Sequence, residues 1–279
     1  MPELAEVAYF AKRWEQGIGD RVERVHVNGK ARIFRDVDTG LLTQMLKGQS
    51  LISVEASAKQ MLFRFSDDVW LGVHLGMTGR LMVGFPEMVP AKHEHLVLFQ
   101  AKRALVFSDY RMFGKVELGV GKAVPEWWAK LPPAILSEGF TREKVGAFCA
   151  RRKRSPIKAI LLMQEVFPGI GNWMADEILW RAGIDPRCLA GKLSDGPKLT
   201  ELFETIQEVT ADALREIAED GRSMGHGDEE RVERLPDSWL FNHRWKPGGN
   251  CPKTGELLMR EKIGGRTTCF SAEWQDWRG

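Results

Sequence analysis

The sequence predicts an α+β fold: an N-terminal antiparallel β-sandwich with a leading helix, followed by a helical domain that ends in a β-hairpin. Two observations predict this division. Up to about residue 120, apolar residues occur in short segments rich in β-branched and aromatic side chains, whereas past about residue 135 their spacing becomes helical. The length of 279 residues is enough for two domains that each bury a core.

The first helix is expected to start almost at the N-terminus, because apolar residues follow helical spacing from Leu4 to Ile18 and Gly17 and Gly19 supply a stop. Short segments typical of antiparallel strands follow, most of them separated by Asp, Gly, Lys or Pro turns. They cover residues 22–27, 52–56, 60–65, 69–76, 80–85, 95–100, 104–109 and 115–120. Residues 1–122 are therefore assigned to the β-sandwich domain.

The proline-rich residues 123–137 are expected to form a linker, and residues 138–235 a helical domain. The helical spacing predicts helices over 141–152, 155–167, 172–184 and 198–221, the last ending at Gly221. Residues 236–279 return to Gly, Pro, Trp and short strands, and residues 250–270 suit a β-hairpin.

The composition excludes several classes of protein. Hydrophobic residues at 43% and charged residues at 28% are ordinary globular values, and a net charge of +2 neither demands nor excludes nucleic acid as a partner. No apolar run is long enough to span a membrane, so we expect a cytoplasmic protein without a membrane partner, and a monomer by default. The scattered Cys149, Cys188, Cys251 and Cys269 form no C-x-x-C pair, which argues against a disulfide framework and against a complete cysteine zinc site.

The N-terminal stretch MPELAEV could carry chemistry. Methionine is commonly removed before proline, and Pro2 would then carry a free secondary amine at the positive end of a helix, which favours its neutral, nucleophilic form. Attack on an aldehydic sugar carbon would give an iminium and promote elimination of phosphate. Glu3 and Glu6 could move protons, or they could merely stabilise the start of the helix electrostatically.

Three further stretches could contact nucleic acid. The segment PGIGN, residues 168–172, offers backbone N–H groups and an Asn cap that suit a phosphate, after the cationic RRKR at 151–154; the alternative is an ordinary glycine turn behind a solvated helix end. In VHLGMTGR and SDYRMFGK, exposed Met77 and Phe113 could act as wedges between base pairs while Arg111 fills the hole left by an extruded base. The alternative is core packing and a surface cation.

Taken together in sequence order, MPELAEV, ASAKQMLF, VHLGMTG, SDYRMFGK, IKAILLMQEVFPGIGNWMADEILW and IGGRTT resemble the formamidopyrimidine-DNA glycosylase and endonuclease VIII family. The resemblance runs from residue 2 to about residue 275. It implies a helix–two-turns–helix module in the second domain and a terminal finger hairpin. It also implies a bifunctional DNA glycosylase and abasic-site lyase of base excision repair, which flips an oxidised base out of duplex DNA, cleaves its glycosidic bond and nicks the strand by β/δ-elimination.

The resemblance also implies roles for individual residues. Pro2 would be the nucleophile that forms a Schiff base, and Glu3 the proton-transfer residue with Glu6 nearby. The other implied positions are Lys59, which would contact phosphate and support catalysis; His74, Asn172 and Arg266, which would clamp the backbone at the flipped nucleotide; and Met77, Arg111 and Phe113, which would fill and wedge the gap. The expected partner is damaged or abasic double-stranded DNA lying between the two domains, no cofactor is expected, and the enzyme would be nucleoid-associated if bacterial.

The chain departs from the family pattern at three places. Where the family usually carries four zinc cysteines in its finger, this sequence has Cys251, Thr254, Ser271 and Trp274, so we expect no metal and a finger held by Trp245, Trp274 or Trp277. Cys251 and Cys269 would lie near one another. Tyr110 and Met112 replace a turn proline and a phosphate-binding arginine, so some affinity is expected to be missing.

The third departure is the segment 221–237, which does not resemble the lesion-covering loop of members that favour oxidised guanine. The preferred lesion therefore stays open among ring-opened purines, oxidised guanine, oxidised pyrimidines and abasic sites. Two other classes of function compete with an active enzyme: a non-catalytic binder of damaged or abasic DNA, and an RNA-associated protein that shares only the module at residues 155–190.

Overall fold

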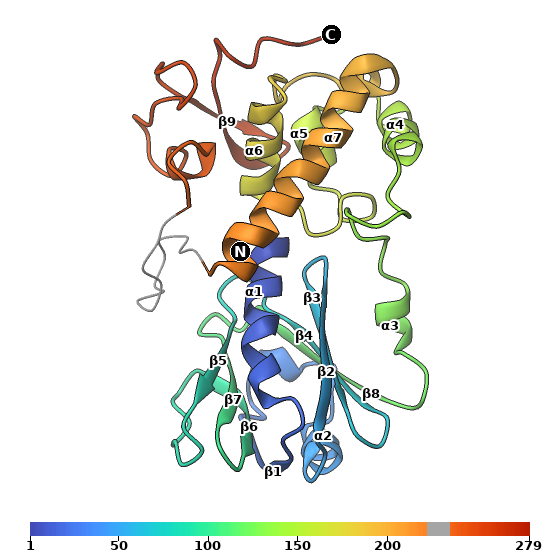
Figure 1. Ribbon diagram of the computed structural model, residues 1–279, viewed down its shortest axis with the longest axis vertical. Coiled ribbons are helices and arrows are strands. Elements are labelled where there is room, and N and C mark those ends of the chain that lie inside the picture. Colours follow the sequence, from blue (N-terminus) through green and yellow to red (C-terminus); the bar gives the residue numbers. More distant parts are fainter. Residues whose placement is uncertain (222–234) are drawn as a thin grey trace. The chain divides into compact units, whose positions relative to one another are not determined.

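The computed structural model describes residues 1–221 and 235–279, and its contacts divide the chain into two compact units, Met1–Leu131 and Pro132–Gly279 (Figure 1). The boundary falls inside the expected linker, residues 123–137. Each unit buries apolar side chains of its own.

Unit 1 is a sandwich of two four-stranded antiparallel sheets, with strand orders β1-β6-β7-β5 and β2-β3-β4-β8. The strands are β1 Val22–Val27, β2 Leu51–Ser57, β3 Gln60–Phe65, β4 Val69–His74, β5 Arg80–Gly84, β6 Glu94–Gln100, β7 Ala104–Ser108 and β8 Lys115–Val120. Both sheets contribute side chains to one apolar core, including Phe63 and Leu71 from one and Leu98 and Phe107 from the other. The predicted antiparallel sandwich is confirmed.

Helix α1 (Leu4–Trp14) packs against β2 and β3 of one sheet and against β5 of the other, so it closes one side of the sandwich (Figure 1). Its apolar face explains this position, because Val7, Phe10 and Trp14 are buried. The Trp14 ring lies 4.7 Å from the ring of Phe63, centroid to centroid, and its indole N–H donates to the Met82 carbonyl at 3.2 Å. A 3₁₀ turn (Glu15–Gly17) follows the helix.

Two features of unit 1 were not anticipated from the periodicity. Helix α2 (Thr39–Leu46) begins at Asp38, whose carboxylate accepts the N–H groups of Gly40 and Leu41 at 2.8 and 3.0 Å. The first part of the expected linker forms a short helix, α3 (Glu126–Ala129), and lies on the sheet. A side chain at Gly72 would collide with the ring of Trp127, so this glycine makes room for it.

Unit 2 contains helices α4 (Arg142–Arg151), α5 (Ile157–Leu161), α6 (Asn172–Arg181) and α7 (Gly196–Ala213), which continues as a π-helical turn over Leu214–Glu219. Unit 2 also contains short 3₁₀ turns at Ala190–Leu193 and Leu240–Asn242. A further 3₁₀ turn, Arg32–Phe34, lies in unit 1. Helix α6 is the centre of unit 2, since all its residues from Trp173 to Trp180 are buried and it packs against α5, α7 and the hairpin (Figure 1).

The helix expected over residues 155–167 is shorter than predicted. Helix α5 ends at Leu161 because the chain then turns around the amide of Gln164, whose Nε2 donates to the carbonyls of Leu162 and Ile170 at 3.1 and 2.7 Å. Pro168 also disfavours a helical conformation in the residue before it.

The predicted hairpin is confirmed as β9 (Met259–Ile263) and β10 (Arg266–Phe270), with Ile263 paired to Arg266 across the turn. Gly264 and Gly265 form the turn with φ of +59° and +78°, values that favour glycine. A Cβ on Gly264 would lie 2.6 Å from the Cβ of Ala159, so the tip of the hairpin is seated against α5.

Candidate functional site

The N-terminus of α1 is organised by its two glutamates. The Glu3 backbone N–H donates to the Glu6 carboxylate at 2.9 Å, while the Glu3 carboxylate accepts the backbone N–H of Glu6, which makes a reciprocal capping box. Glu3 is only 4% exposed, whereas Met1 is 55% exposed. Pro2 therefore directly precedes a helix start whose two carboxylates accept backbone N–H groups in a capping box.

Lys59 and His74 are neighbours at one end of the two central strands, β3 and β4, of their sheet. Lys59 lies in the β2–β3 turn beside Ala58, which adopts φ of +56°, and the next residue, Gln60, pairs with His74 across β3 and β4. Burial, followed by the positive charges of Lys59 and Arg35, lowers the pKa of His74 below its ordinary value. Its Nδ1 accepts the Gly76 N–H at 3.0 Å, so in the neutral ring Nε2 carries the hydrogen and is the donor.

The wedge candidates are exposed on two loops of unit 1. Met77 and Phe113 are 37% and 43% exposed, and the Arg111 guanidinium lies 4.8 Å from the centroid of the Phe113 ring. A Cβ on Gly76 would lie 2.4 Å from the carbonyl carbon of Phe113, so the two loops touch through their backbones. The structure thus brings Met77, Arg111 and Phe113 together on unit 1.

Asn172 and Arg266 are brought together on unit 2. The Asn172 side chain donates from Nδ2 to the carbonyl of Thr267 at 2.8 Å, and Thr267 follows the exposed Arg266 in β10. The expectation that Asn172 caps the helix is wrong. Gly171 holds the cap position and Asn172 is the first helical residue, with its side chain turned to the hairpin instead of to the N–H groups of the first turn.

The glycine loop before α6 is held by Gln164, which sequence reasoning did not single out. Its Oε1 accepts the Gly169 N–H at 3.1 Å, and its Nε2 donates to the Ile170 carbonyl. The only sequence signal was a polar pair, Gln164 and Glu165, inside an otherwise apolar segment. The cationic residues 151–154 are exposed.

A buried ion cluster supports the Asn172 end of α6 and was also missed. The Asp176 carboxylate accepts three kinds of hydrogen bond. The donors are the Lys158 ammonium, Nε of the Arg244 guanidinium at 3.0 Å and the backbone N–H of Cys269 at 3.1 Å. Lys158 also donates to the Asn172 carbonyl at 2.7 Å. Since Lys158 and Asp176 are almost wholly buried, the cluster fixes α5, α6 and the hairpin to one another.

The four finger positions that carry zinc cysteines in the usual family pattern do not suit a zinc ion here. Cys251 accepts the indole N–H of Trp180 at 3.3 Å, and the Ser271 hydroxyl contacts Glu256 and accepts the Trp274 N–H at 3.0 Å. The remaining two positions hold Thr254 and Trp274. The indole of Trp274 offers no lone pair to a metal. No cluster of three or more His, Cys, Asp or Glu side chains suited to a metal exists among the described residues.

The hairpin is held instead by aromatic and sulfur contacts with α6. The Trp274 indole donates to the Trp180 carbonyl at 2.6 Å, and the Lys253 ammonium lies 4.6 Å and 4.0 Å from the ring centroids of Trp180 and Trp274. Burial raises the pKa of the Cys251 thiol, but hydrogen bonds from Thr254 and Trp180 outweigh it, and the net pKa lies below the ordinary value.

Trp245 and Trp277, which were also expected to hold the finger, make contacts of other kinds. The backbone of Trp277 bridges to Ile184, whereas Trp245 packs on Phe241 at 5.0 Å, centroid to centroid. Cys251 and Cys269 belong to one buried cluster, as expected.

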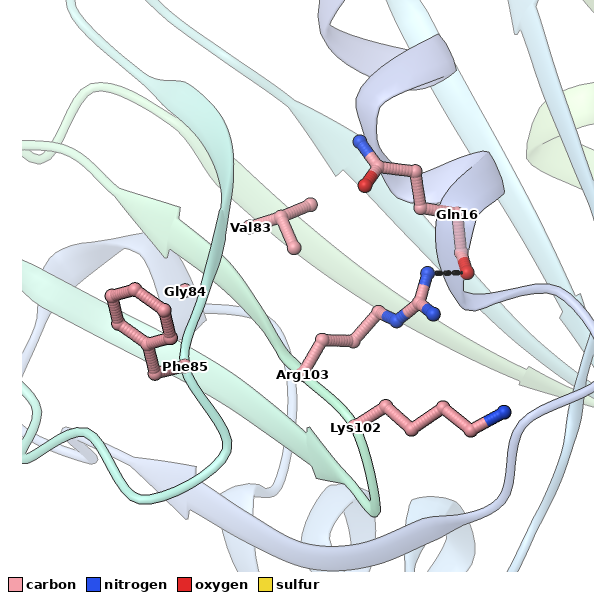
Figure 2. A pocket seen from close by; sticks show the side chains of 6 residues that line it. All are labelled: Gln16, Val83, Gly84, Phe85, Lys102 and Arg103. Atoms are coloured by element: carbon pink, nitrogen blue, oxygen red, sulfur yellow. Dashed lines mark hydrogen bonds between the residues drawn. The ribbon is translucent and has the colours of Figure 1, made fainter.

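A surface pocket of about 330 Å³ lies elsewhere on unit 1 (Figure 2). Gln16, Phe85, Lys102 and Arg103 line it, and Arg103 donates to the Gln16 carbonyl. Gln16 follows the C-terminal end of α1, whereas Pro2 precedes its N-terminal end. The pocket is therefore separate from the groups that could do chemistry.

Comparison with known proteins assigns the family. Residues 1–116 match the formamidopyrimidine-DNA glycosylase N-terminal domain, and residues 131–223 match the formamidopyrimidine-DNA glycosylase H2TH domain. A formamidopyrimidine-DNA glycosylase of Paracoccus denitrificans is 33% identical over 97% of this chain and 98% of its own. The chain belongs to the formamidopyrimidine-DNA glycosylase family. The family consists of DNA glycosylases of base excision repair, so this is the class of enzyme to which the chain belongs.

Further relatives and solved structures agree with this assignment. A formamidopyrimidine-DNA glycosylase of Carboxydothermus hydrogenoformans is 30% identical over 99% of this chain and 100% of its own. The Lactococcus lactis Fpg in complex with DNA that contains an abasic site has a TM-score of 0.84, with 25% identity over 98% of this chain and 99% of that one. MutM in complex with DNA that contains carbocyclic 8-oxo-G has a TM-score of 0.83 at 25% identity, over the same shares.

The last two sequence expectations concern membrane-spanning helices and the segment 221–237. None of the described helices combines the length and the apolar character that a membrane span needs. The segment 221–237, where the sequence departs from the family pattern, lies outside the described residues over 222–234.

Proposed function

We propose that this chain is a bifunctional DNA glycosylase and abasic-site lyase that removes oxidised bases from duplex DNA through a Schiff base on Pro2. The observation that carries the proposal is the start of α1. There Pro2 follows Met1 and directly precedes Glu3, whose backbone and carboxylate are held with Glu6 in a capping box. The exposed Met1 is accessible for the removal that would free the Pro2 amine.

In the proposed reaction the Pro2 amine attacks C1′ of the damaged nucleotide as the bond from C1′ to the base breaks and the departing base takes up a proton. Glu3 is the group proposed to move this proton, with Glu6 holding the Glu3 backbone. Loss of the amine proton leaves an aminal at C1′, and cleavage of the C1′–O4′ bond, with a proton taken up by O4′, opens the sugar ring and gives an iminium between Pro2 and C1′. Removal of a C2′ proton then expels the 3′ phosphate, and a second elimination expels the 5′ phosphate.

The remaining residues are proposed to hold the DNA. Lys59 and His74 lie side by side on unit 1, and a neutral His74 offers its Nε2 hydrogen to a phosphate oxygen. On unit 2, Asn172 and Arg266 are proposed to contact the backbone, because their elements are joined by the bond from Asn172 to the Thr267 carbonyl. Met77, Arg111 and Phe113 are proposed to fill the gap that the extruded base leaves.

Reduction with borohydride in the presence of DNA that contains an abasic site tests the proposal. The enzyme should become covalently attached to the strand, and Pro2→Gly should weaken the adduct. An N-terminal tag should abolish cleavage and leave binding largely intact, because it removes the amine lone pair. Tagged protein that nicks as well as untagged protein would point to another amine, such as Lys59.

The same experiment separates the enzyme from a non-catalytic binder of damaged or abasic DNA. A binder would retard the same duplex on a gel and give no covalent adduct at any enzyme concentration. A panel of single-lesion duplexes then ranks ring-opened purines, oxidised guanine, oxidised pyrimidines and abasic sites as substrates.

A further inference from the structure

The two loops of unit 1 that carry Met77, Arg111 and Phe113 pack backbone against backbone. The loop between β4 and β5 carries Met77, and the loop between β7 and β8 carries Arg111 and Phe113. A Cβ on Gly76 would lie 2.6 Å from the Gly114 nitrogen, and a Cβ on Gly114 would lie 2.9 Å from the His74 carbonyl oxygen. Side chains are therefore excluded where the loops meet.

One carboxylate joins the two loops. Asp109 is fully buried, and its Oδ1 accepts the hydroxyl of Thr78, the residue after Met77, at 2.5 Å. Its Oδ2 accepts the Gly114 N–H at 2.8 Å, directly after Phe113, and Oδ1 also lies 3.3 Å from the Arg111 N–H. Arg111 itself donates to the Asp109 carboxylate, whereas Met77 and Phe113 each directly precede a residue that does.

The backbone of Asp109 is in turn fixed to the sheet. Its carbonyl oxygen lies 2.9 Å from Nε2 of the buried His95 on β6, and its N–H donates to the His93 carbonyl at 3.0 Å. Met112 closes the turn with an N–H bond to the same Asp109 carbonyl and adopts φ of +53°, a conformation that L-residues rarely hold without support. The carboxylate therefore connects both loops to a rigid strand.

We propose that the hydrogen bond between Thr78 and Asp109 is a latch that makes Met77, Arg111 and Phe113 enter the duplex as one rigid group. This inference rests on the proposed function and deepens it. Thr78 and Asp109 act as positioning residues, since neither reaches the sugar chemistry assigned to Pro2. The latch matters only where a base pair must be opened and its gap filled, so it gives selectivity for duplex over single-stranded substrate.

The test uses Thr78→Val, which removes the hydroxyl and keeps the side-chain shape, and Thr78→Ser, which keeps the hydroxyl. The rate of borohydride trapping is measured on an abasic duplex and on the same abasic strand alone. Thr78→Val should slow trapping on the duplex about tenfold, because it removes the closer of the two donors to a buried carboxylate oxygen and leaves only the long bond from the Arg111 N–H. Trapping on the single strand should stay within about twofold of the starting enzyme, and Thr78→Ser should restore the duplex rate.

A Thr78→Val enzyme that traps the duplex at the original rate would overturn the inference. So would an equal loss on duplex and single strand, since that is the result of general damage to unit 1. If the unaltered enzyme traps neither substrate, the proposed function fails. The latch is then tested by equilibrium binding instead. The affinity for a duplex that contains a stable abasic analogue is compared with the affinity for the same single strand.

Equilibrium binding also supports a double-mutant cycle with Met77→Ala. If Thr78 acts by positioning Met77, the two losses in duplex affinity should not add, and the double variant should bind like Met77→Ala alone. Additive losses would show that Thr78 acts elsewhere and would contradict the latch.

Discussion

At the scale of single residues, Glu3 has one observed task and one proposed task at the start of α1. Its carboxylate accepts a backbone N–H of the first turn, and it is the group proposed to move the proton in base excision. The two tasks can be separated, because a glutamine keeps an acceptor oxygen for the helix and cannot transfer the proton.

Glu3→Gln should therefore lower base excision about 10²-fold or more, the usual contribution of a positioned acid or base, while the helix stays capped. The measurement is single-turnover release of an oxidised base, with the thermal midpoint of unfolding followed alongside. Glu6→Gln is the matched control within the same capping box. Equal excision by Glu3→Gln and the starting enzyme would remove Glu3 from the reaction.

His74 should make stability depend on pH in a defined direction. Burial lowers its folded-state pKa below the value of the unfolded chain, so its contribution is fully present above pH about 6.5 and is lost as pH falls through the lowered folded-state pKa. His74→Asn keeps an acceptor near the Gly76 N–H and does not titrate. The difference in unfolding free energy between the two proteins should fall below pH about 6.5, by no more than about 1.4 kcal/mol per pH unit.

Denaturant titrations from pH 8 to pH 5 check this expectation. A difference that stays constant over this range, or that grows in favour of the histidine protein on acidification, contradicts the lowered pKa of His74.

At the scale of elements, one face of α6 holds the hairpin along its whole length. Asn172 bonds to the Thr267 carbonyl, Asp176 accepts the Cys269 N–H, and the Trp180 indole donates to Cys251. These residues are spaced four apart, which places them on one face of the helix. Glu177 beside them accepts the Phe241 N–H at 3.0 Å. The position of Arg266 therefore depends on contacts with α6.

Asp176→Asn should destabilise unit 2 by about 3–5 kcal/mol, because it leaves the buried cations Lys158 and Arg244 without their shared carboxylate. Chemical denaturation followed by tryptophan fluorescence measures the loss. The matched control is Glu165→Gln, which breaks an exposed ion pair with Arg152 and should cost less than about 1 kcal/mol. Similar costs for both variants would contradict the importance of the buried cluster.

The finger should need no metal. Elemental analysis of the purified protein should find no stoichiometric zinc, and treatment with a chelator should leave its thermal midpoint and DNA affinity unchanged, because Cys251 already accepts a hydrogen bond from Trp180 and Ser271 bonds to Glu256. One zinc ion per chain, or unfolding of the hairpin on chelation, would contradict this expectation.

The periodicity of the sequence predicted the strands, the long helices and the hairpin, because each depends on a local pattern. It failed where tertiary contacts decide. The helix over residues 155–167 ends early because Gln164 folds the chain back on itself. Asn172 does not cap α6 because the helix starts one residue earlier than an Asn172 cap requires, with Gly171 at the cap position and the Asn172 side chain bonded to the hairpin. The role of Asp109 could not be predicted for the same reason, because its carboxylate bonds to Thr78, 31 residues earlier in the chain.

At the scale of the whole molecule, a net charge of +2 must be reconciled with binding a polyanion. Local cations can do this, because each phosphate that is neutralised releases counterions and makes affinity depend on salt. Duplex affinity should therefore fall steeply between low and physiological ionic strength.

Arg266→Gln should reduce the slope of log affinity against log salt by about one unit. Lys102→Gln is the matched control, since Lys102 lines the pocket beyond the C-terminal end of α1 (Figure 2). Fluorescence anisotropy with a labelled duplex gives both slopes. A flat salt response, or equal slopes for Arg266→Gln and the starting protein, would contradict the assigned contact.

The central claim is that the amine of Pro2 is the nucleophile, and locating the covalent bond tests it most directly. After borohydride reduction on abasic DNA, the adduct is digested with nuclease and trypsin and its peptides are sequenced by mass spectrometry. The account predicts that the sugar remnant is carried by the peptide of residues 2–12, on the nitrogen of Pro2 itself. A remnant found on Lys59 or on any other lysine would contradict the account.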